Sequence, residues 1–142
     1  MTASSPDSGP QEICLHVCVT CRQAGGPDDR ALRPGAILHR ALAEALARDD
    51  APAVRVEAVE CLSVCKRPCT IAVSGPGRWT YIYGDLDPAV SVETILDGLR
   101  RYAATSDGLV PWRERPEAFR KGVVARLPPM PSKDSVLKAS NP

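Results

Sequence analysis

The positions of the cysteines constrain the fold and chemistry of this chain more than any other sequence feature. Six cysteines occur among 142 residues, and they form two short groups. The first group comprises Cys14, Cys18 and Cys21, and the second comprises Cys61, Cys65 and Cys69. The N-terminal sequence lacks the positive and then apolar stretches of a secretory signal, so we expect a cytoplasmic protein. Thiols clustered in that reducing compartment favour metal, iron–sulfur or redox chemistry over structural disulfides.

Composition and charge exclude several other classes of protein. Apolar residues make up 44% of the chain and charged residues 25%, which is typical of a globular domain. The formal net charge is only +1, so the chain has no general attraction to nucleic acid or to an anionic membrane surface. No apolar run approaches the roughly 20 residues that a transmembrane helix needs. We therefore expect neither nucleic acid nor membrane as a partner.

The length of the chain fits one domain with short ends. Residues 1–11 are polar and predict a disordered lead. Residues 128–142 hold several Pro and Ser, which predict a flexible tail. The single domain is therefore expected over residues 12–127.

Hydrophobic periodicity within this domain predicts strands and helices in the order β-α-β-β-β-α. The strands are expected at residues 13–19, 54–58, 70–73 and 79–83, and the helices at 35–49 and 88–102. The domain begins with a strand, a helix and a second strand, and this order predicts that the two strands are parallel and joined by a right-handed crossover. The Gly-Pro-Gly turn at residues 75–77 predicts a hairpin. The fold class is therefore α/β, with a single mixed sheet and helices packed on it.

The segment after the last predicted helix is expected to be an irregular C-terminal extension. Pro116 can start a short helix that runs to about Lys121. We expect the extension to pack back on the domain through Trp112, Phe119, Val123 and Val124.

The two cysteine groups follow strands that are predicted to be parallel. The ends of such strands lie at the same edge of the sheet, so the groups are brought together there. Cys14, His16 and Cys18 alternate along one strand at spacings of about 6.6 Å, whereas sulfurs sharing a tetrahedral zinc lie about 3.8 Å apart. These three residues therefore cannot easily share one ion, and we interpret Cys14 and His16 as ordinary strand residues.

The remaining cysteines have the spacing of metal ligands. Cys18-x2-Cys21 spans a strand end and Cys61-x3-Cys65 lies in a loop, so each pair can curl around a metal. Together they supply four thiolates, the set used by a 2Fe–2S cluster or by a structural zinc site. Cys69 is a further candidate ligand, either in place of Cys65 or as an additional resolving thiol.

Other groups of residues have simpler interpretations. Trp79, Tyr81 and Tyr83 alternate along one predicted strand and are expected to pack beneath a helix or the C-terminal segment. Asp85 and Asp87 are explained by a turn and by a helix cap before Pro88. No acid–base or nucleophilic set is recognisable, so we do not expect an enzyme.

Four stretches resemble an uncharacterised bacterial family of predicted metal-binding proteins, domain of unknown function number 1636. They are CVTCR at 18–22, CLSVCKRPCT at 61–70, TYIYGDLDP at 80–88 and DGLVPWRERPEAFRKGVVARLPP at 107–129. The association of that family with cobalamin and cobalt-handling gene neighbourhoods implies a link to cobalamin metabolism.

CLSVCKRP is also similar to the second cysteine pair of thioredoxin-like 2Fe–2S ferredoxins, with Cys18 and Cys21 in the place of the first pair. This resemblance implies a thioredoxin-like ferredoxin fold. The first pair is closer together here than in that family, and Cys69 is additional.

The leading hypothesis is a 2Fe–2S ferredoxin-like protein that carries one electron to or from a redox partner protein. Its cluster ligands are Cys18, Cys21, Cys61 and Cys65, with Cys69 in reserve. The alternative is a protein that binds or delivers zinc or cobalt without electron transfer. A third hypothesis is thiol–disulfide exchange through Cys18 and Cys21. The identity of the partner and the oligomeric state stay open, a homodimer included.

Overall fold

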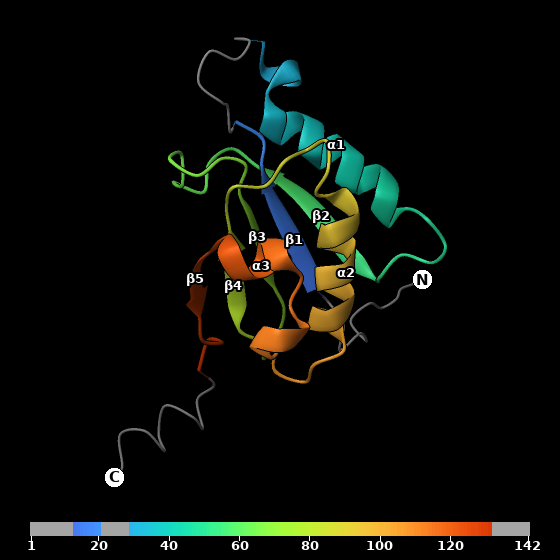
Figure 1. Ribbon diagram of the computed structural model, residues 1–142, viewed down its shortest axis with the longest axis vertical. Helices are drawn as coiled ribbons and strands as arrows, with labels where there is room; N and C mark the ends of the chain where they lie inside the picture. The colour runs from blue at the N-terminus through green and yellow to red at the C-terminus, as the bar shows by residue number, and fades with distance from the viewer. Residues whose placement is uncertain (1–12, 21–28, 132–142) are drawn as a thin grey trace.

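The computed structural model of the protein describes residues 13–20 and 29–131 (Figure 1). The expected lead at residues 1–11, the candidate ligand Cys21 and residues 132–142 of the expected tail lie outside this range. The strands are β1 (Ile13–Cys18), β2 (Val54–Val59), β3 (Ile71–Ser74), β4 (Thr80–Tyr83) and β5 (Val123–Leu127). The α-helices are α1 (Pro34–Leu46), α2 (Val92–Ala103) and α3 (Glu117–Lys121), and short 3-10 helices occur at Arg30–Leu32 and Trp112–Glu114.

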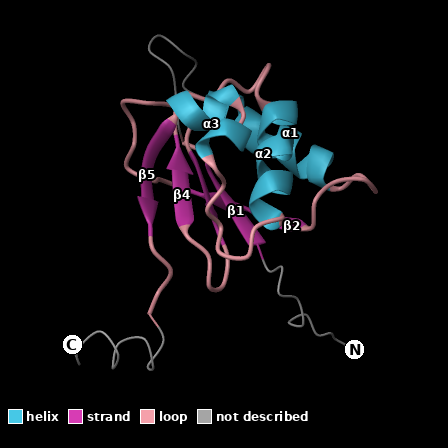
Figure 2. Ribbon diagram, turned by 60° about the horizontal axis from the view of Figure 1, so that its bottom comes forward, coloured by secondary structure: helices cyan, strands magenta, loops and turns pink. Residues whose placement is uncertain are grey.

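The strands form one mixed sheet in the order β2-β1-β3-β4-β5. Strands β1 and β2 are parallel, and every other neighbouring pair is antiparallel. The predicted parallel pair and the predicted β3–β4 hairpin are therefore confirmed. Figures 1 and 2 show α1, α2 and α3 on one face of this sheet. No helix in the described part of the chain is long and apolar enough to cross a membrane.

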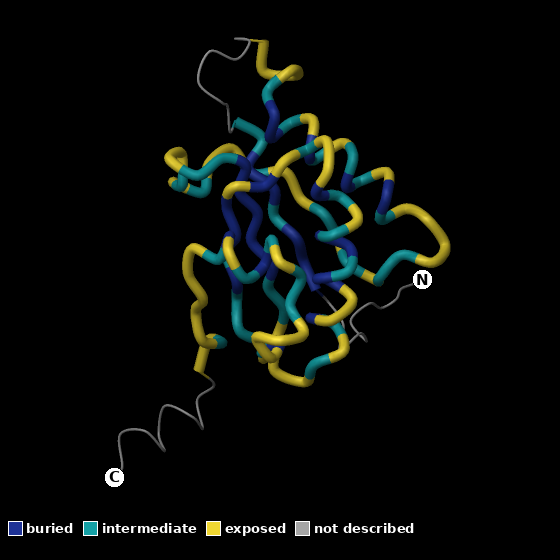
Figure 3. The backbone as a smooth tube through the Cα atoms, viewed as in Figure 1, coloured by how far each residue is buried: buried dark blue, intermediate teal, exposed yellow. Residues whose placement is uncertain are grey.

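The core lies between the sheet and the helices, as the dark segments of Figure 3 show. Ile13, Leu15 and Val17 of β1 point to this side and are at most 1% exposed. Alternate residues of a strand point to opposite faces, so Cys14 and His16 lie on the face that the helices do not cover. Leu38 and Leu42 of α1, and Ile95, Leu96 and Leu99 of α2, complete the packing against the sheet.

Helix α2 starts four residues later than predicted. The Asp87 carboxylate accepts a hydrogen bond from the backbone N–H of Ala89 at 2.8 Å, which closes a turn before the helix. The helix itself begins at Val92, after Ser91. An Asp-Pro pair fits both a helix cap and a turn, and here it forms the turn.

The segment after α2 is more regular than the expected irregular extension. The predicted short helix is α3, but residues Val123–Leu127 form a fifth strand paired with β4. Phe119 is buried as expected, and Val123 packs against the core. Trp112 is 56% exposed and Val124 36% exposed, so the expectation that these two side chains pack inward is wrong. Because β5 is an edge strand with little buried surface, it lacks the alternation that reveals a strand in sequence.

The aromatic residues of β4 pack beneath the helices, as predicted. The ring of Tyr83 stacks on Phe119 of α3, with centroids 3.8 Å apart. The Tyr81 ring stacks beside Tyr83 and meets the ring of Tyr102 edge-on. This aromatic row joins the hairpin to α2 and α3.

Stability is expected to fall at alkaline pH because Tyr102 is buried. The Tyr102 hydroxyl donates to the carbonyl of Trp79 at 2.5 Å, and burial raises the pKa of Tyr102 from 10.0 to about 12. The pKa of Tyr102 is higher in the folded protein than in the unfolded chain, so folding is favoured as long as the hydroxyl is protonated. This contribution to stability is complete below pH 10 and is lost as the pH rises towards 12. This loss amounts to about 1.4 kcal/mol per pH unit for one tyrosine.

The check is urea unfolding of the parent and of Tyr102→Phe at pH 8 and pH 11. At pH 8 the variant should be less stable by about 1 kcal/mol, because it lacks the hydrogen bond. Between the two pH values it should lose less stability than the parent. Burial also raises the pKa of Tyr83, so some alkaline loss remains in the variant. Equal losses in the two proteins would contradict the prediction.

Candidate metal centre

Strands β1 and β2 bring Cys18 of the first cysteine group and Cys61 of the second to one edge of the sheet. In their parallel register Cys18 lies opposite Val59, and each strand ends at that position. Cys61 follows two residues after Val59. The chain therefore leaves both strands at the same edge, with a cysteine from each group beside it.

Hydrogen bonds join the two loops at this edge. The Cys18 thiol donates to the carbonyl of Glu60 at 3.8 Å, and the Thr20 hydroxyl donates to the same carbonyl. The backbone N–H of Val19 donates to the carbonyl of Val59 at 2.9 Å. Cys18 is thus held next to the start of the loop that carries the second cysteine group.

The loop from Cys61 to Cys69 presents its first two cysteines to the surface. Cys61 and Cys65 are both exposed. The backbone N–H of Ser63 donates to Sγ of Cys61 at 3.2 Å. Ser63 adopts a left-handed backbone conformation, with φ of 61°. A hydrogen bond to a ligating sulfur stabilises the thiolate and tunes the metal group that it holds.

Cys69 has a different environment from the other two cysteines of its group. Its side chain is fully buried and belongs to the hydrophobic core. Its backbone N–H and carbonyl each form a hydrogen bond of 3.2 Å with Leu86. The position of Cys69 is therefore fixed on both sides by the fold.

The described cysteines supply the right donors but do not yet form a closed metal site. Cys18, Cys61 and Cys65 are described, whereas the candidate ligand Cys21 lies outside the described residues. Within residues 13–20 and 29–131, no three His, Cys, Asp or Glu side chains are arranged to hold a metal ion. A thiolate donor set at the end of β1 and in the loop after β2, with an N–H on one sulfur, fits an iron–sulfur group in kind.

Arg67 connects this loop to the C-terminal part of the fold. Its Nε donates to the Asp85 carboxylate at 2.7 Å, and its Nη2 donates to the carbonyl of Lys121 at 3.2 Å. A third contact joins Nη1 to the carbonyl of Val123 at 3.5 Å. Sequence reasoning missed this role, because the partners of Arg67 are 18 or more residues away in sequence.

Removing the Arg67 guanidinium should loosen the loop. We expect Arg67→Gln to raise hydrogen exchange in the peptide 61–67 about fivefold, equivalent to about 1 kcal/mol, since these contacts are partly exposed. The measurement is hydrogen–deuterium exchange followed by mass spectrometry. Lys66→Gln is the matched control, because it removes a neighbouring charge from an exposed side chain. Equal exchange in the two variants would show that Arg67 does not hold the loop.

Cys14 lies away from this edge, on the face of the sheet that the helices do not cover. Its side chain is 9% exposed. Burial raises the pKa of the Cys14 thiol, and the nearby Arg55 guanidinium partly opposes that effect. The thiol therefore stays protonated at neutral pH and is a poor nucleophile.

Comparisons with known proteins support the fold. The family model described as "Protein of unknown function (DUF1636)" matches residues 15–129. No curated protein matches the chain. A thioredoxin-like 2Fe–2S ferredoxin from Aquifex aeolicus has a TM-score of 0.54 at 19% identity, covering 82% of this chain and 93% of the ferredoxin.

A cysteine-to-serine variant of the thioredoxin-like ferredoxin from Aquifex aeolicus is also similar, with a TM-score of 0.51 at 18% identity. That match covers 80% of this chain and 98% of the variant. Identities this low show the fold alone. The predicted thioredoxin-like ferredoxin fold is thereby confirmed.

Proposed function

The chain belongs to the family described as "Protein of unknown function (DUF1636)", and we propose that it is an iron–sulfur protein that carries one electron to or from a partner protein. One observation carries the proposal. Cys18 is hydrogen-bonded to the loop that holds Cys61 and Cys65, at one sheet edge of a fold that is similar to a solved 2Fe–2S ferredoxin.

We assign the cluster ligands to Cys18, Cys21, Cys61 and Cys65. Cys61 and Cys65 are exposed, so they can turn towards a common group without breaking the core. Cys69 is fully buried and its backbone is paired with Leu86, so we assign it a structural role. A 2Fe–2S cluster in this place supplies one-electron chemistry close to the protein surface.

The residues around these ligands suit a group of negative charge. The Ser63 N–H donates to Cys61 Sγ, and hydrogen bonds to ligand sulfurs tune the group that those sulfurs hold. Lys66 and Arg67 follow the second ligand pair and offset the charge of four thiolates. Arg67 also restrains the loop through its contacts with Asp85 and Lys121. A restrained loop needs less rearrangement when the charge of the group changes.

The alternative function is a zinc or cobalt site without electron transfer. The close spacing of Cys18-x2-Cys21 favours this alternative, because such spacing is typical of zinc sites. The same four cysteines would then close a tetrahedral site. Zinc and cobalt(II) centres of this kind carry no labile sulfide, and this difference separates the two functions by analysis.

The experiment is the measurement of iron, zinc, cobalt and acid-labile sulfide per chain in protein purified without oxygen. About two irons and two sulfides per chain, with a paramagnetic signal that appears on one-electron reduction, would support the ferredoxin function. One zinc or cobalt per chain without sulfide would overturn it in favour of the alternative.

A further inference from the structure

Strand β2 forms one edge of the sheet, and no strand in the described part of the chain pairs with its outer side. The carbonyl of Val59 accepts a hydrogen bond from the N–H of Val19 at 2.9 Å, so the backbone of Val59 points towards β1. Backbone groups point to alternate sides along a strand, and those of Val56 and Ala58 therefore point away from β1. Ala58 is exposed, so α1 does not cover the edge there. The outer side of β2 thus offers backbone donors and acceptors to a further strand.

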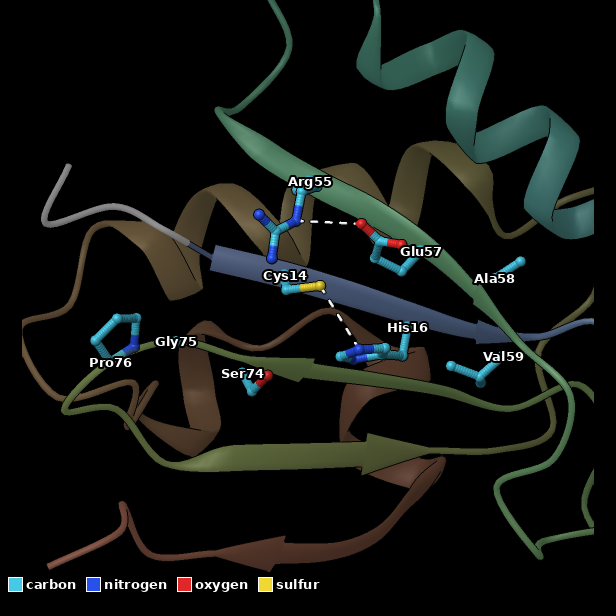
Figure 4. Close-up of a pocket in the computed structure, with 9 residues that line it drawn as sticks. All are labelled: Cys14, His16, Arg55, Glu57, Ala58, Val59, Ser74, Gly75 and Pro76. Atoms are coloured by element: carbon cyan, nitrogen blue, oxygen red, sulfur yellow. Dashed lines mark hydrogen bonds and ion pairs between the residues drawn. The ribbon is translucent and has the colours of Figure 1, made fainter. Parts of the chain in front are cut away.

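The two charged residues of β2 lie on the face of the sheet that the helices leave uncovered (Figure 4). Arg55 and Glu57 contact each other at 3.3 Å, and their side chains are 67% and 50% exposed. On the neighbouring strand β1, Sγ of Cys14 and Nε2 of His16 are 3.7 Å apart. A positive and a negative charge therefore stand at the rim of the sheet, where a strand added beyond β2 would meet both.

The order of residues in β2 is complementary to itself. When two copies of its sequence, VRVEAV, run antiparallel about a two-fold axis at Val56, Arg55 of each copy lies opposite Glu57 of the other. The two Val56 residues then exchange both of their backbone hydrogen bonds, because these groups point outwards. Arg55 and Glu57 form the non-hydrogen-bonded pairs, in which the Cα atoms are only about 4.5 Å apart and the side chains are closest. Opposite charges placed directly across a strand pair stabilise it.

Neither another register nor the other edge of the sheet has this property. An axis at Arg55 or at Glu57 would bring like charges face to face, which destabilises a strand pair. The other edge strand, β5, carries a single charged residue, Arg126, and its guanidinium lies 4.8 Å from the ring centre of Trp79. Charges on an edge strand often repel a second strand, but repulsion requires one sign, and β2 carries both. The sequence of β2 therefore favours one strand and one register.

We propose that the chain forms a two-fold symmetric dimer through β2, so that the two five-stranded sheets become one continuous sheet. The partner at this edge is a second copy of the same chain. The two β2 strands run in opposite directions, so their ends at Val59 lie about 20 Å apart along the strands. Each cysteine centre follows such an end, and the dimer leaves both centres open to a redox partner.

The test is sedimentation equilibrium of the full-length protein at several concentrations, with charge reversals in β2. The parent should show a monomer–dimer equilibrium. Arg55→Glu and Glu57→Arg each place like charges opposite one another in both symmetric contacts, and each should weaken the dimer by about tenfold or more. The double variant Arg55→Glu/Glu57→Arg restores opposite charges and should regain most of the affinity of the parent. A parent that stays monomeric, or single variants that dimerise like the parent, would overturn the proposal.

A further variant tests the backbone pairing without changing a charge. Ala58→Pro removes an N–H that points away from β1, so it keeps the pairing of β1 with β2. It removes two symmetric hydrogen bonds between the copies and should weaken the dimer by about tenfold. Unchanged dimerisation of Ala58→Pro, or a double charge variant as weak as the single ones, would also overturn the proposal.

The matched control is Arg113→Glu, which makes the same change of charge at an exposed residue outside β2. It should leave the dimer unchanged, and weakening equal to that in Arg55→Glu would count against the β2 contact. Iron and sulfide, measured in the same samples, should be the same in every variant as in the parent. Failure of the dimer is thereby distinguished from failure of the proposed electron-transfer function.

Discussion

Replacing Cys61 with serine should remove the bound group: we expect iron and sulfide to fall from about two of each per chain to near zero. A serine hydroxyl is a harder and more basic donor than a thiol, and it binds a soft metal centre poorly. The neighbouring Ser63 N–H would also lose the sulfur that it contacts at 3.2 Å. The measurement is iron and sulfide content, with the visible spectrum, of protein purified without oxygen.

Cys18→Ser and Cys65→Ser should behave in the same way, whereas Cys69→Ser should keep the bound group. Cys69 is the matched control because it belongs to the same cysteine group but is fully buried in the core. Unchanged iron and sulfide in Cys61→Ser and Cys65→Ser would disprove the ligand assignment. Loss in Cys69→Ser together with retention in Cys65→Ser would make Cys69 the fourth ligand.

The substitution Gly98→Ala adds a single methyl group and should destabilise the protein by about 3 kcal/mol, which is the upper end of the usual cost of overpacking a core. A Cβ atom at Gly98 in α2 would overlap the ring of Phe119 in α3. That ring is 3% exposed and is stacked on Tyr83, so it has little room to move. In an exposed helix the same change would stabilise by about 1 kcal/mol, because alanine is the better helix former.

The sign of the Gly98 effect can be tested in a double-mutant cycle with Phe119. Phe119→Ala removes the ring and should cost about 3–5 kcal/mol by itself. In that background Gly98→Ala should be neutral or stabilising, because the methyl group no longer meets the ring. Unfolding in urea measures all four proteins. Equal effects of Gly98→Ala in the two backgrounds would show that the ring contact is not the cause.

Much of the fold could be predicted because its central elements have strong periodic patterns. The alternation of Ile13, Leu15 and Val17 is that of a buried strand, and the crossover rule made β2 its parallel neighbour. The same topology predicted that the cysteine groups meet at one edge. The edge strand β5 was missed because it is mostly exposed, and its pairing with β4 joins residues far apart in sequence.

The parts of the site that escaped prediction depend on the reach of side chains. Arg67 contacts carbonyls on a distant segment, and no local pattern indicates such partners. The Cys14–His16 contact escaped because strand spacing describes the backbone, whereas a histidine ring extends well beyond it. Sequence periodicity locates residues on a face of the sheet, but it does not give the positions of their terminal atoms.

The contacts of Arg67 bear on the order of events during protein synthesis. All six cysteines have been synthesised once residue 69 has been added to the chain. The carbonyls that hold Arg67 belong to Lys121 and Val123, which are 54 and 56 residues further along the chain. The contacts with Asp85 and Leu86 can form earlier, but the cysteine loop gains its last anchoring contacts only when this final part of the domain appears. Insertion of the proposed cluster is therefore expected to follow completion of the domain rather than to occur on the growing chain.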